Sequence, residues 1–473
     1  MGLEVIGKNL QFRMTEGDFM IFQDKKVLVC GAGLSGVAAA GLLLRQGSVV
    51  TLHDSREDAV CPENLAAHPL VSTFFGKDAT EIVENFDIVV LSPGISINQP
   101  FAAKARACGI DVIGELELAA SLCVAPILAI TGTNGKTTTT SMVGDIMRLF
   151  VPESQVVGNI GIPFCDFAEA IPKNAFAVAE VSSFQLESIK DFRPRISAVL
   201  NMAEDHLNRH LTMETYVAAK ERIFENQGPG DFCVLNFDNE YTHQMAAKVK
   251  SGTEVIFFSN SPLKSGVFIQ DGGIYINWRD YWGEVLKIDE MQVLGSHNVE
   301  DAMAAAAISA AAGVPLDIIA KGLREFKGAE HRLEFCGEVV GVSFFNDSKA
   351  TNPDAAIKGL EAMVRPTILI GGGQDKGLDF SDWVQGFEGR VKSFIIIGEA
   401  AEKVAQTCRE QGFEHYVYCD TLENAVKLAF ERAAAGDCVL LSPACASLDM
   451  FDSYEHRGRV FKENVKRILE IRG

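Results

Sequence analysis

The residues best suited to chemistry are Thr131-Gly132-Thr133-Asn134-Gly135-Lys136-Thr137. They follow an apolar run at 126–130, which predicts a buried strand, and they precede residues 138–149, which predict a helix. In such a turn the backbone N–H groups point at anionic oxygens, and the helix N-terminus adds about half a positive charge. A lysine there reaches terminal phosphates, and a threonine hydroxyl can hold Mg²⁺. The segment therefore predicts a nucleotide-binding enzyme.

The spacing of this loop is irregular. The usual pattern is G-x-x-x-x-G-K-[ST], and Ile130 stands where its first glycine belongs. A glycine turn that merely follows a strand is the alternative interpretation. The order of strand, Gly-Lys-Thr and helix favours the phosphate site.

A second glycine-rich turn, Gly31-Ala32-Gly33-Leu34-Ser35-Gly36, follows the predicted strand 26–30. Asp54 stands 18 residues beyond Gly36, where an acid can hold a ribose hydroxyl. Taken literally, this is a dinucleotide fingerprint. Its physical content is a diphosphate at a helix N-terminus, so a UDP-sugar fits the pattern as well as NAD does.

Short apolar runs alternate with helical stretches along the chain, which predicts α/β domains built on parallel sheets. We expect three domains, namely a Rossmann-like domain at 1–114, a P-loop ATPase-type domain at 115–328 and a second Rossmann-like domain at 329–473. The predicted strands of the last domain end in small residues, as in open sheets whose ligands bind at the strand ends. These strands are 367–370, 393–397 and 438–441.

Composition narrows the class of protein. The chain has 473 residues, 47% of them hydrophobic, and 43 Lys and Arg against 63 Asp and Glu, a net charge of −20. That balance works against binding nucleic acid or an anionic membrane. The 11 cysteines form no C-x-x-C pair, which argues against a disulfide framework or a zinc site. We expect a cytoplasmic protein, since no secretion signal and no run of about 18–20 apolar residues is evident.

Several polar residues follow predicted strands of the middle domain. Glu180 ends one strand and is well placed for Mg²⁺, although a solvated loop glutamate is the simpler interpretation. His206 follows the next strand and is either a metal ligand or a loop cap. The helical pattern predicts that Lys220 is a surface lysine beside Glu221, and an ammonium group cannot bind a cation.

The last domain carries three candidate anion sites. Arg332 could clamp a phosphate or form a hinge salt bridge. Residues 346–353 combine a lysine, hydroxyls and a proline, which suits a small carboxylate, and residues 442–451 form a small-residue turn before a helix. Cys445 in that turn invites a nucleophile interpretation, but no partner histidine is evident, which favours a packing role.

The order of these motifs resembles that of the Mur ligases, the ATP-dependent amide ligases of peptidoglycan precursor synthesis. The resemblance spans essentially the whole chain, and its motifs are residues 131–137, 158–161, 180–187, 204–206, 216–220, 297–298, 331–332, 346–352, 442–448 and 457–458. Segments 346–352 and 442–447 are similar to the branch of the family that adds D-glutamate. The Asp-Asn-Pro-Arg signature of the diaminopimelate- or lysine-adding branch is absent from the sequence.

The resemblance implies a fold and a reaction. The first domain would bind a UDP-sugar, the second ATP, and the third would close over both and bind the amino acid. The carboxylate of UDP-N-acetylmuramoyl-L-alanine (UDP-MurNAc-L-Ala) would attack the γ-phosphate of ATP, and D-glutamate would then displace phosphate from the acyl phosphate. Two Mg²⁺ ions would assist. The implied partners are small molecules alone, with no nucleic acid and no membrane insertion, and the implied state is a monomer.

The resemblance also implies roles for individual residues. The catalytic set is Lys136, His206 and Lys220. ATP would contact Gly132, Thr133, Asn134, Gly135, Lys136, Thr137, Thr138, Asn298, Arg332 and Asp347. The UDP-sugar would contact Leu34, Ser35, Asp54, Ser55, Arg56, Ser92 and Asn159. D-glutamate would contact Lys349, Thr351, Lys376, Ser447, Leu448 and Phe451.

The implied metal ligands explain how a lysine could take part. Thr137 and Glu180 would hold one Mg²⁺ and His206 the second. Lys220 matches a lysine that the family carries as a carbamate, in which added CO₂ turns the ammonium into an anionic oxygen ligand. The sequence does not show this modification, which therefore stays a hypothesis.

Other functions remain compatible with the sequence. A ligase of the same architecture could add a different amino acid or extend folate with glutamate. An NAD-dependent oxidoreductase would use Gly31–Gly36 and Asp54. A pure binding module would not need the Lys-Thr loop, Glu180 and His206 together.

Overall fold

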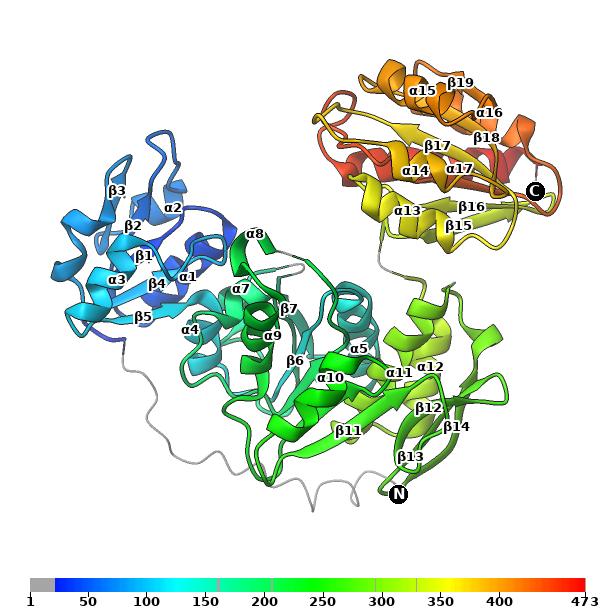
Figure 1. Ribbon diagram of the computed structural model, residues 1–473. Helices are drawn as coiled ribbons and strands as arrows, with labels where there is room; N and C mark the ends of the chain where they lie inside the picture. The colour runs from blue at the N-terminus through cyan, green and yellow to red at the C-terminus, as the bar shows by residue number, and fades with distance from the viewer. Residues whose placement is uncertain (1–21, 160–161, 206, 294, 329, 473) are drawn as a thin grey trace. The chain divides into compact units, whose positions relative to one another are not determined.

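The structure is a computed structural model, and it describes residues 22–159, 162–205, 207–293, 295–328 and 330–472 (Figure 1). The chain divides into two compact units. The first contains the described residues up to Lys136 together with Phe150–Phe257, and the second contains Thr137–Leu149 and the described residues from Phe258 onward.

The first sheet of unit one is entirely parallel, with strand order β3-β2-β1-β4-β5. Its strands are β1 (Lys26–Cys30), β2 (Val49–Asp54), β3 (Val71–Phe75), β4 (Ile88–Leu91) and β5 (Asp111–Gly114). Its helices are α1 (Leu34–Arg45), α2 (Glu63–Ala66) and α3 (Pro100–Ala107). The chain reverses its direction of travel across the sheet between β1 and β4, and ligands bind at such switch points, outside the carboxyl ends of the strands.

Successive residues of these strands alternate between two clusters of buried side chains, one on each face of the sheet. Val27 and Val29 of β1 belong to one cluster of buried residues, and Leu28 and Cys30 belong to another, which includes Phe101 of α3. Both faces of the sheet are therefore covered, which is the usual condition of a parallel sheet.

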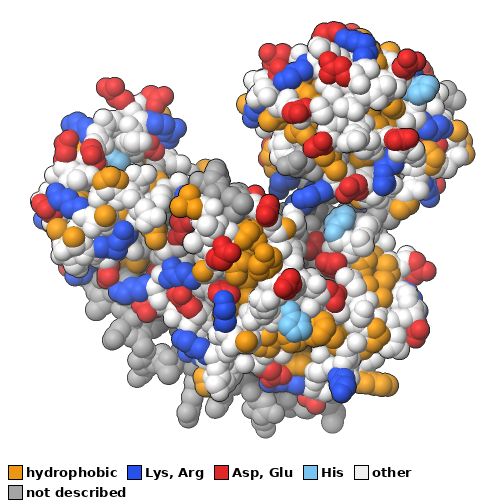
Figure 2. Space-filling view, viewed as in Figure 1, with side chains coloured by type: hydrophobic (Ala, Val, Ile, Leu, Met, Phe, Trp, Pro, Cys, Tyr) orange, Lys and Arg blue, Asp and Glu red, His pale blue; other side chains and the backbone are white. Residues whose placement is uncertain are grey.

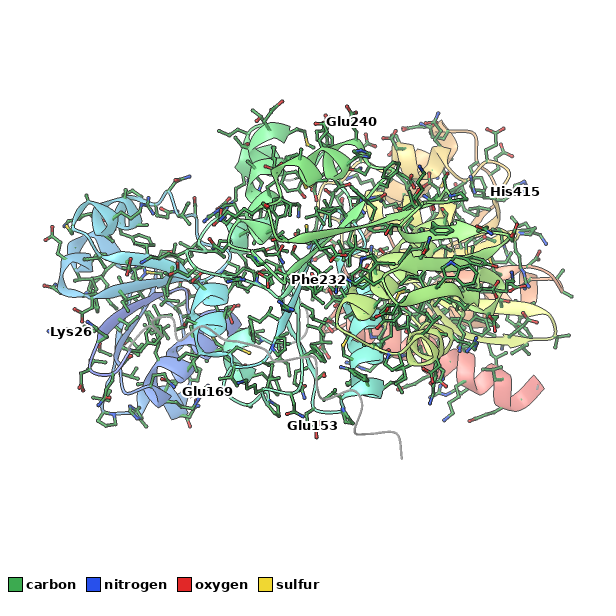
Figure 3. The ribbon with its side chains drawn as sticks, turned by 90° about the horizontal axis from the view of Figure 1, so that it is seen from below. Lys26, Glu153, Glu169, Phe232, Glu240 and His415 are labelled. Carbon is green, nitrogen blue, oxygen red and sulfur yellow. The ribbon has the colours of Figure 1, made fainter. Side chains whose placement is uncertain are left out.

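Five further strands of unit one are also parallel and adjoin one another in the order β10-β9-β6-β8-β7, which is one end of a longer sheet. They are β6 (Ile127–Thr131), β7 (Gln155–Gly158), β8 (Ala177–Glu180), β9 (Ile196–Val199) and β10 (Phe232–Asn236). Phe232, the first residue of β10, is labelled in Figure 3. The helices are α4 (Glu115–Leu122), α5 (Lys136–Phe150), which continues into unit two, α6 (Phe164–Phe167), α7 (Ser183–Leu186), α8 (Leu207–His210), α9 (Met213–Glu221) and α10 (Glu240–Met245).

A polar contact joins the two sheets' helices within unit one. Arg45, at the end of α1, donates to Glu169 Oε2 at 2.7 Å and to the Cys165 carbonyl at 3.2 Å. Glu169 is labelled in Figure 3. This contact and the shared apolar cluster hold α1 against α6.

The apolar runs 267–270 and 274–277 around Asp271-Gly272-Gly273 predict a hairpin, and unit two contains it. It is formed by β12 (Gly266–Gln270) and β13 (Gly273–Trp278), and β14 (Tyr281–Lys287) lies antiparallel to β13. β11 (Glu254–Ser259), which the boundary between the units crosses, pairs with β12 in parallel. Two helices follow, α11 (Ser296–Ala311) and α12 (Leu316–Glu325). Gln270 lies opposite Gly273, so the turn is Asp271-Gly272, and both turn residues have positive φ, 48° and 72°. Those angles favour Asp-Gly in a two-residue hairpin turn.

The last sheet has the order β15-β16-β20-β17-β18-β19 and is parallel except for β15. Its strands are β15 (Glu334–Val339), β16 (Val342–Asn346), β17 (Thr367–Gly372), β18 (Val391–Ile397), β19 (Tyr416–Tyr418) and β20 (Cys438–Leu441). Its helices are α13 (Pro353–Glu361), α14 (Ser381–Gln385), α15 (Ala401–Glu410), α16 (Leu422–Arg432) and α17 (Tyr454–Arg472). The three strands expected here are confirmed, and the loops after β16, β17 and β20 share one edge.

Two surface observations bear on partners. On the face drawn in Figure 2, Lys and Arg side chains are interspersed with Asp and Glu. Within the described ranges, no helix combines the length and the apolar character needed to cross a membrane.

Candidate functional site

The phosphate loop has the predicted geometry. β6 ends at Thr131 and α5 begins at Lys136. Gly132 and Gly135 both have positive φ, 156° and 79°, and a Cβ on Gly132 would lie 3.0 Å from the Leu200 side chain. A side chain at Gly132 would be both strained and crowded, so the turn needs glycine.

Lys136 folds back over this loop. Its Nζ donates to the carbonyl oxygens of Gly132 and Thr133, each at 2.8 Å. The ammonium is therefore held within the loop whose backbone would receive phosphates.

Lys220 is buried against the same loop, so the prediction of a surface lysine is wrong. Its side chain lies on the buried face of α9 with Tyr216 and is only 1% exposed. Its Nζ donates to the Gly132 carbonyl at 2.8 Å and to Thr131 Oγ1 at 3.2 Å. The pattern misled because α9 buries only Tyr216, Ala219 and Lys220, a narrow face that a nine-residue helix shows weakly in its sequence.

Burial changes the chemistry of this lysine. It holds the pKa of Lys220 well below the usual range, and the charge of Lys136 adds to the effect, while Asp205 and Glu180 oppose it. The neutral amine is consequently populated at lower pH than in an exposed lysine. A neutral amine is the form that reacts with CO₂.

Glu180 supplies a carboxylate beside the loop. It ends β8, is 2% exposed, and its Oε1 accepts from Asn159 Nδ2 at 2.8 Å. The Asn159 backbone N–H also donates to the Glu180 carbonyl at 2.9 Å. Gly158 permits this approach, because a Cβ there would lie 2.4 Å from that carbonyl oxygen. The structure thus joins Asn159 to the carboxylate, whereas the resemblance assigned it to the UDP-sugar.

The oxygen donors suit a hard cation such as Mg²⁺, which binds carboxylates and keeps several waters. His206, the third predicted ligand, lies outside the described residues. Within the described ranges, no three His, Cys, Asp or Glu side chains gather closely enough to hold a metal by themselves. A metal at Glu180 would therefore rely on hydroxyl, phosphate or carbamate oxygens as well.

Apart from Asn159, the predicted UDP-sugar residues gather at the switch point of the first sheet. Asp54 ends β2, and its carboxylate accepts from the backbone N–H groups of Ala32 and Arg56, both at 3.0 Å. The Arg56 guanidinium also binds it at 3.0 Å, and these contacts hold the pKa of Asp54 below its usual range despite burial. A Cβ on Gly36 would lie 1.7 Å from the Gly31 carbonyl, so α1 packs directly on the turn.

The other members of that set lie on adjoining segments. Ser92, just after β4, donates from Oγ to the Gly31 carbonyl at 3.4 Å. Leu34 is 81% exposed at the start of α1, Ser35 is half-buried, and Ser55 is exposed after β2. An exposed leucine beside a polar crevice offers an apolar surface to a ligand.

The nucleotide residues predicted in unit two lie on separate elements. Thr137 and Thr138 lie in the first turn of α5, and Asn298 is buried on α11. Asp347 follows β16, is 4% exposed, and accepts from Ser442 Oγ at 2.7 Å. Burial raises the pKa of Asp347 to about 7, and the charge of the exposed Arg332 opposes that rise.

The predicted D-glutamate residues lie in the loops after β16, β17 and β20. The Lys349 N–H donates to the His331 carbonyl at 3.0 Å, which ties the loop after β16 to the segment before β15. The Gln374 N–H donates to Ala446 O at 2.9 Å, which ties the loops after β17 and β20 together. Their predicted contact residues are Lys349, Thr351, Lys376, Ser447, Leu448 and Phe451. Of these, Ser447 is buried and Lys376 is exposed.

Cys445 has the packing role that the sequence favours. Its side chain is fully buried, and burial raises the pKa of its thiol to about 12. A thiol held in its neutral form is a poor nucleophile.

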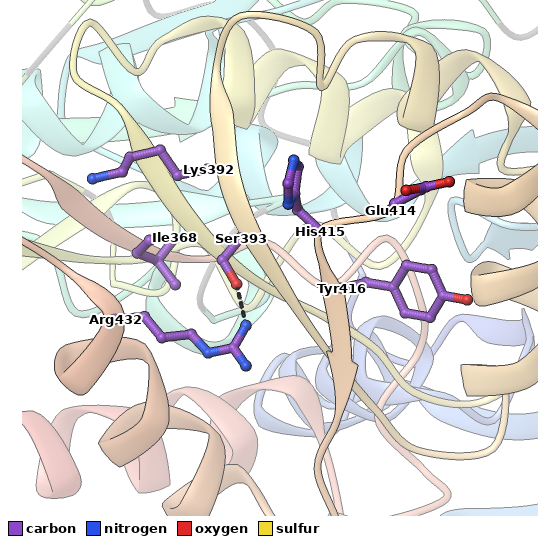
Figure 4. A pocket seen from close by; sticks show the side chains of 7 residues that line it. All are labelled: Ile368, Lys392, Ser393, Glu414, His415, Tyr416 and Arg432. Carbon is purple, nitrogen blue, oxygen red and sulfur yellow. Dashed lines mark hydrogen bonds between the residues drawn. The ribbon is translucent and has the colours of Figure 1, made fainter.

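The cavity drawn in Figure 4 lies elsewhere. It encloses about 430 Å³ and is lined by Ile368, Lys392, Ser393, Glu414, His415, Tyr416 and Arg432. These residues lie near the amino ends of β17, β18 and β19, whereas the loops of the candidate site leave the carboxyl ends of parallel strands. The cavity is therefore separate from the candidate site.

Sequence reasoning missed two buried charged residues. Asp301 of α11 is 5% exposed and accepts from Thr139 Oγ1 at 3.1 Å. It lies three residues after Asn298, a spacing that places both on one helix face and could have flagged it. Arg457 of α17 is 1% exposed and binds two of the strand-end loops, although the sequence showed it only as part of a motif.

Comparison with known families gives three matches in order along the chain. Residues 25–114 match the Mur ligase MurD-like N-terminal domain, 130–309 the Mur ligase middle domain, and 331–445 the Mur ligase glutamate ligase domain. A UDP-N-acetylmuramoylalanine--D-glutamate ligase of Thermoanaerobacter sp. (strain X514) is 44% identical over 96% of this chain and 100% of its own length. The chain belongs to the Mur ligase family.

Similar relatives and structures agree with this assignment. Ligases of the same name from Koribacter versatilis and Lachnospira eligens are 45% and 43% identical, each over 95% of this chain and 99% and 100% of their own lengths. The crystal structure of UDP-N-acetylmuramate-alanine ligase MurC from Thermotoga maritima superposes with a TM-score of 0.57 at 18% identity, covering 94% of this chain and 99% of that one. The fold of this Mur ligase is therefore the expected three-domain α/β fold.

Proposed function

We propose that this Mur ligase uses ATP to join UDP-MurNAc-L-Ala to D-glutamate through an acyl phosphate, in peptidoglycan precursor synthesis. The observation that carries the proposal is the 44% identity, over 96% of the chain, to a ligase named for that reaction. The Gly31–Gly36 turn then serves a UDP-sugar diphosphate and not NAD, because residues 25–114 match a Mur ligase domain.

The first step transfers the γ-phosphoryl group of ATP to the carboxylate of the UDP-sugar. A carboxylate does not form an amide at neutral pH, and phosphorylation turns one of its oxygens into a leaving group. The backbone N–H groups of Gly132–Lys136 and the Lys136 ammonium bind the phosphates and neutralise their charge. Positioning and charge neutralisation are the main demands of phosphoryl transfer.

Thr137, Glu180 and His206 are proposed to hold Mg²⁺, with Lys220 as a carbamate. Bound Mg²⁺ would screen the phosphate charge and orient the transferring group. Two features support the carbamate: the pKa of Lys220 is held low, and its Nζ lies 2.8 Å from the Gly132 carbonyl. Carbamylation joins the neutral amine to CO₂ with loss of one proton, and the side chain becomes an anion that no longer repels a metal.

The second step needs the D-glutamate amine close to the acyl carbon. The loops that carry Lys349, Lys376 and Ser447 are proposed to bind its carboxylates, and the two lysines complement that charge. The amine attacks the acyl carbon, phosphate leaves, and the amine loses a proton. Asn298, Arg332 and Asp347 are proposed to bind the nucleotide.

The remaining proposals concern the state of the enzyme. We propose a cytoplasmic monomer without nucleic-acid or membrane partners, with domains at 1–114, 115–328 and 329–473. The 11 cysteines are all free thiols in the structure, which fits a reducing compartment.

The test is phosphate release from ATP and Mg²⁺ in the presence of UDP-MurNAc-L-Ala. D-glutamate, L-glutamate, L-lysine and diaminopimelate are compared as the second substrate. Release that requires both the UDP-sugar and D-glutamate supports the proposal. Release with another amino acid would keep the ligase chemistry and move the chain to another branch. No release with any of them would overturn the proposal.

A further inference from the structure

One buried cation lies among the loops that carry the proposed amino-acid site. Arg457 has 1% of its surface exposed and lies in the first turn of α17. Its Nε donates to Ser348 Oγ at 3.0 Å, and its Nη2 donates to the Ser348 carbonyl at 2.9 Å. One guanidinium therefore holds both the side chain and the backbone of the loop after β16.

The same guanidinium holds the loop after β20. Nη1 donates to the carbonyls of Cys445 and Ala446 at 3.1 and 3.3 Å, and Nη2 donates to Cys445 O at 3.1 Å. These carbonyls immediately precede Ser447, which is proposed to contact D-glutamate. The planar fork of arginine can hold several acceptors in fixed directions, which a lysine ammonium cannot do.

A third loop packs directly against Arg457. A Cβ on Gly373, which follows β17, would lie 3.2 Å from Arg457 Nη1 and 2.3 Å from the Ala446 carbonyl. Gly373 leads into the loop that carries Lys376. All three strand-end loops of the proposed amino-acid site therefore meet at one guanidinium.

The charge of this guanidinium is met by no ion pair among the described residues, although the carboxylates of Asp449 and Asp347 act on it from a greater distance. Burial lowers the pKa of Arg457 to about 10, so the group is still charged at neutral pH. Throughout the described residues, no carboxylate lies within ion-pairing distance of it, and the hydrogen-bond acceptors that hold it are a hydroxyl and carbonyls. A buried cation without a carboxylate partner is costly in a purely structural role, whereas its field favours an anionic ligand nearby.

We infer that Arg457 is the positioning residue of the amino-acid site: it fixes the three loops that bind D-glutamate and adds a positive field there. The inference rests on the proposed function. Arg457 takes no part in phosphoryl transfer, and Asp347, the nucleotide residue beside Ser348, is held separately by Ser442 Oγ at 2.7 Å and by the Leu333 N–H at 3.3 Å. Loss of Arg457 should therefore impair the second step and spare the first.

The experiment separates the two steps. Hydroxylamine is a small nucleophile that needs no amino-acid site, and it converts an acyl phosphate into a hydroxamate. We compare hydroxamate formation with D-glutamate addition in the unmodified enzyme and in Arg457→Ala, Arg457→Lys and Ser348→Ala. Arg432→Ala is the matched control, because Arg432 contacts Ser393 at the opposite edge of the same sheet.

In Arg457→Ala and Arg457→Lys, the KM for D-glutamate should rise at least about tenfold, while hydroxamate formation and the KM values for ATP and the UDP-sugar stay within about twofold. Ser348→Ala should raise the KM for D-glutamate less, and Arg432→Ala should leave it unchanged. Added guanidinium ion should partly restore D-glutamate addition in Arg457→Ala.

Two results would overturn the inference. One is an unchanged KM for D-glutamate, and the other is a parallel loss of both steps in a variant that unfolds at the same temperature as the unmodified enzyme. If Arg457→Ala does not fold, Arg457→Lys and Ser348→Ala decide between the outcomes. Failure of the proposed function is distinct, because the unmodified enzyme would then reject D-glutamate.

Discussion

At the scale of single residues, Lys220 is the strongest test of the proposed chemistry. A buried ammonium 2.8 Å from a carbonyl of the phosphate loop would oppose a metal, and a carbamate would bind one. We expect Lys220→Ala to lower kcat at least about 100-fold with little change in unfolding temperature. Lys248→Ala is the control, because Lys248 is an exposed lysine that contacts Glu221 of the same helix.

Carbamylation can be observed directly. Enzyme equilibrated with ¹³C-bicarbonate should show one carbamate carbon signal by NMR, absent in Lys220→Ala and present in Lys248→Ala. Full activity of Lys220→Ala, or an active enzyme without that signal, would refute the carbamate.

Asp301 gives a pH prediction because its carboxyl is buried, and the charge of Arg332 offsets the effect of burial on its pKa only in part. Burial raises its pKa to about 7 from about 3.9 when unfolded. The folded state then holds a proton that the unfolded state loses, so this group lowers stability by up to about 1.4 kcal/mol per pH unit between those values. This loss of stability is absent at pH values below the pKa of the unfolded state and complete at pH values above the pKa of the folded state.

Asp301→Asn removes this penalty and can still accept from Thr139. The unfolding temperature of Asp301→Asn should therefore exceed that of the unmodified enzyme by an amount that grows from pH 5 to pH 7 and then levels off. Thermal unfolding of both proteins across that range, without ligands, is the measurement. A difference that does not change with pH would contradict the prediction.

For single residues, the sequence predicted which side chains belong to the site better than it predicted how each one is buried and what it contacts. The Gly-Lys-Thr order placed Lys136 in the loop, because the turn is local. The burial of Lys220 depends on residues 84–89 positions earlier in the chain, at 131–136, and no local pattern reports such a contact. The convergence of three loops on Arg457 was equally invisible, since Ser348 lies 109 residues from it.

At the scale of elements, the Gly31–Gly36 turn shows what a glycine contributes. A Cβ on Gly36 would lie 1.7 Å from the Gly31 carbonyl, so Gly36→Ala must move α1 or the turn. We expect a loss of about 1–3 kcal/mol in stability and a higher KM for the UDP-sugar. Thermal unfolding and steady-state kinetics measure the two effects.

Gly33→Ala is the matched control for stability in the same turn. Its φ is −82°, and a Cβ there would meet nothing within 4 Å. Its cost should stay below about 1 kcal/mol, the usual effect of losing a favourable helix N-cap. Equal destabilisation by the two substitutions would show that the close approach at Gly36 does not matter.

Elements with strong apolar periodicity were predictable and exposed ones were not. Apolar runs at 26–30, 88–91, 232–236 and 438–441 predict buried strands, and β1, β4, β10 and β20 have those bounds. β3 (Val71–Phe75) was missed because its side chains are largely exposed or half-buried at the edge of the sheet, as was the edge strand β14. The helical pattern of residues 213–226 predicts one helix, but α9 ends at Glu221 because the chain tightens into a 3₁₀ turn at Arg222–Phe224.

At the scale of the whole molecule, each sheet carries its proposed ligand residues beyond the carboxyl ends of its strands. The order of motifs and the alternation of strands and helices made this arrangement predictable, because parallel sheets present their loops at one edge. The proposed bridging of these edges by ligands was not predictable, since no local pattern of residues specifies it.

The proposed reaction requires that bridging. The UDP-sugar residues belong to unit one and the D-glutamate residues to unit two, yet an amine must approach the acyl carbon to about 3–3.5 Å. We therefore expect a rigid-body closure when the UDP-sugar and a non-hydrolysable ATP analogue bind together. Small-angle X-ray scattering should show a smaller radius of gyration with both ligands, and a smaller change or none with ADP alone. The forward scattering should also give the mass of a monomer, 51.3 kDa, in every state. A profile unchanged by both ligands would mean that the enzyme is already closed, or that the acyl phosphate reaches the amine without domain motion.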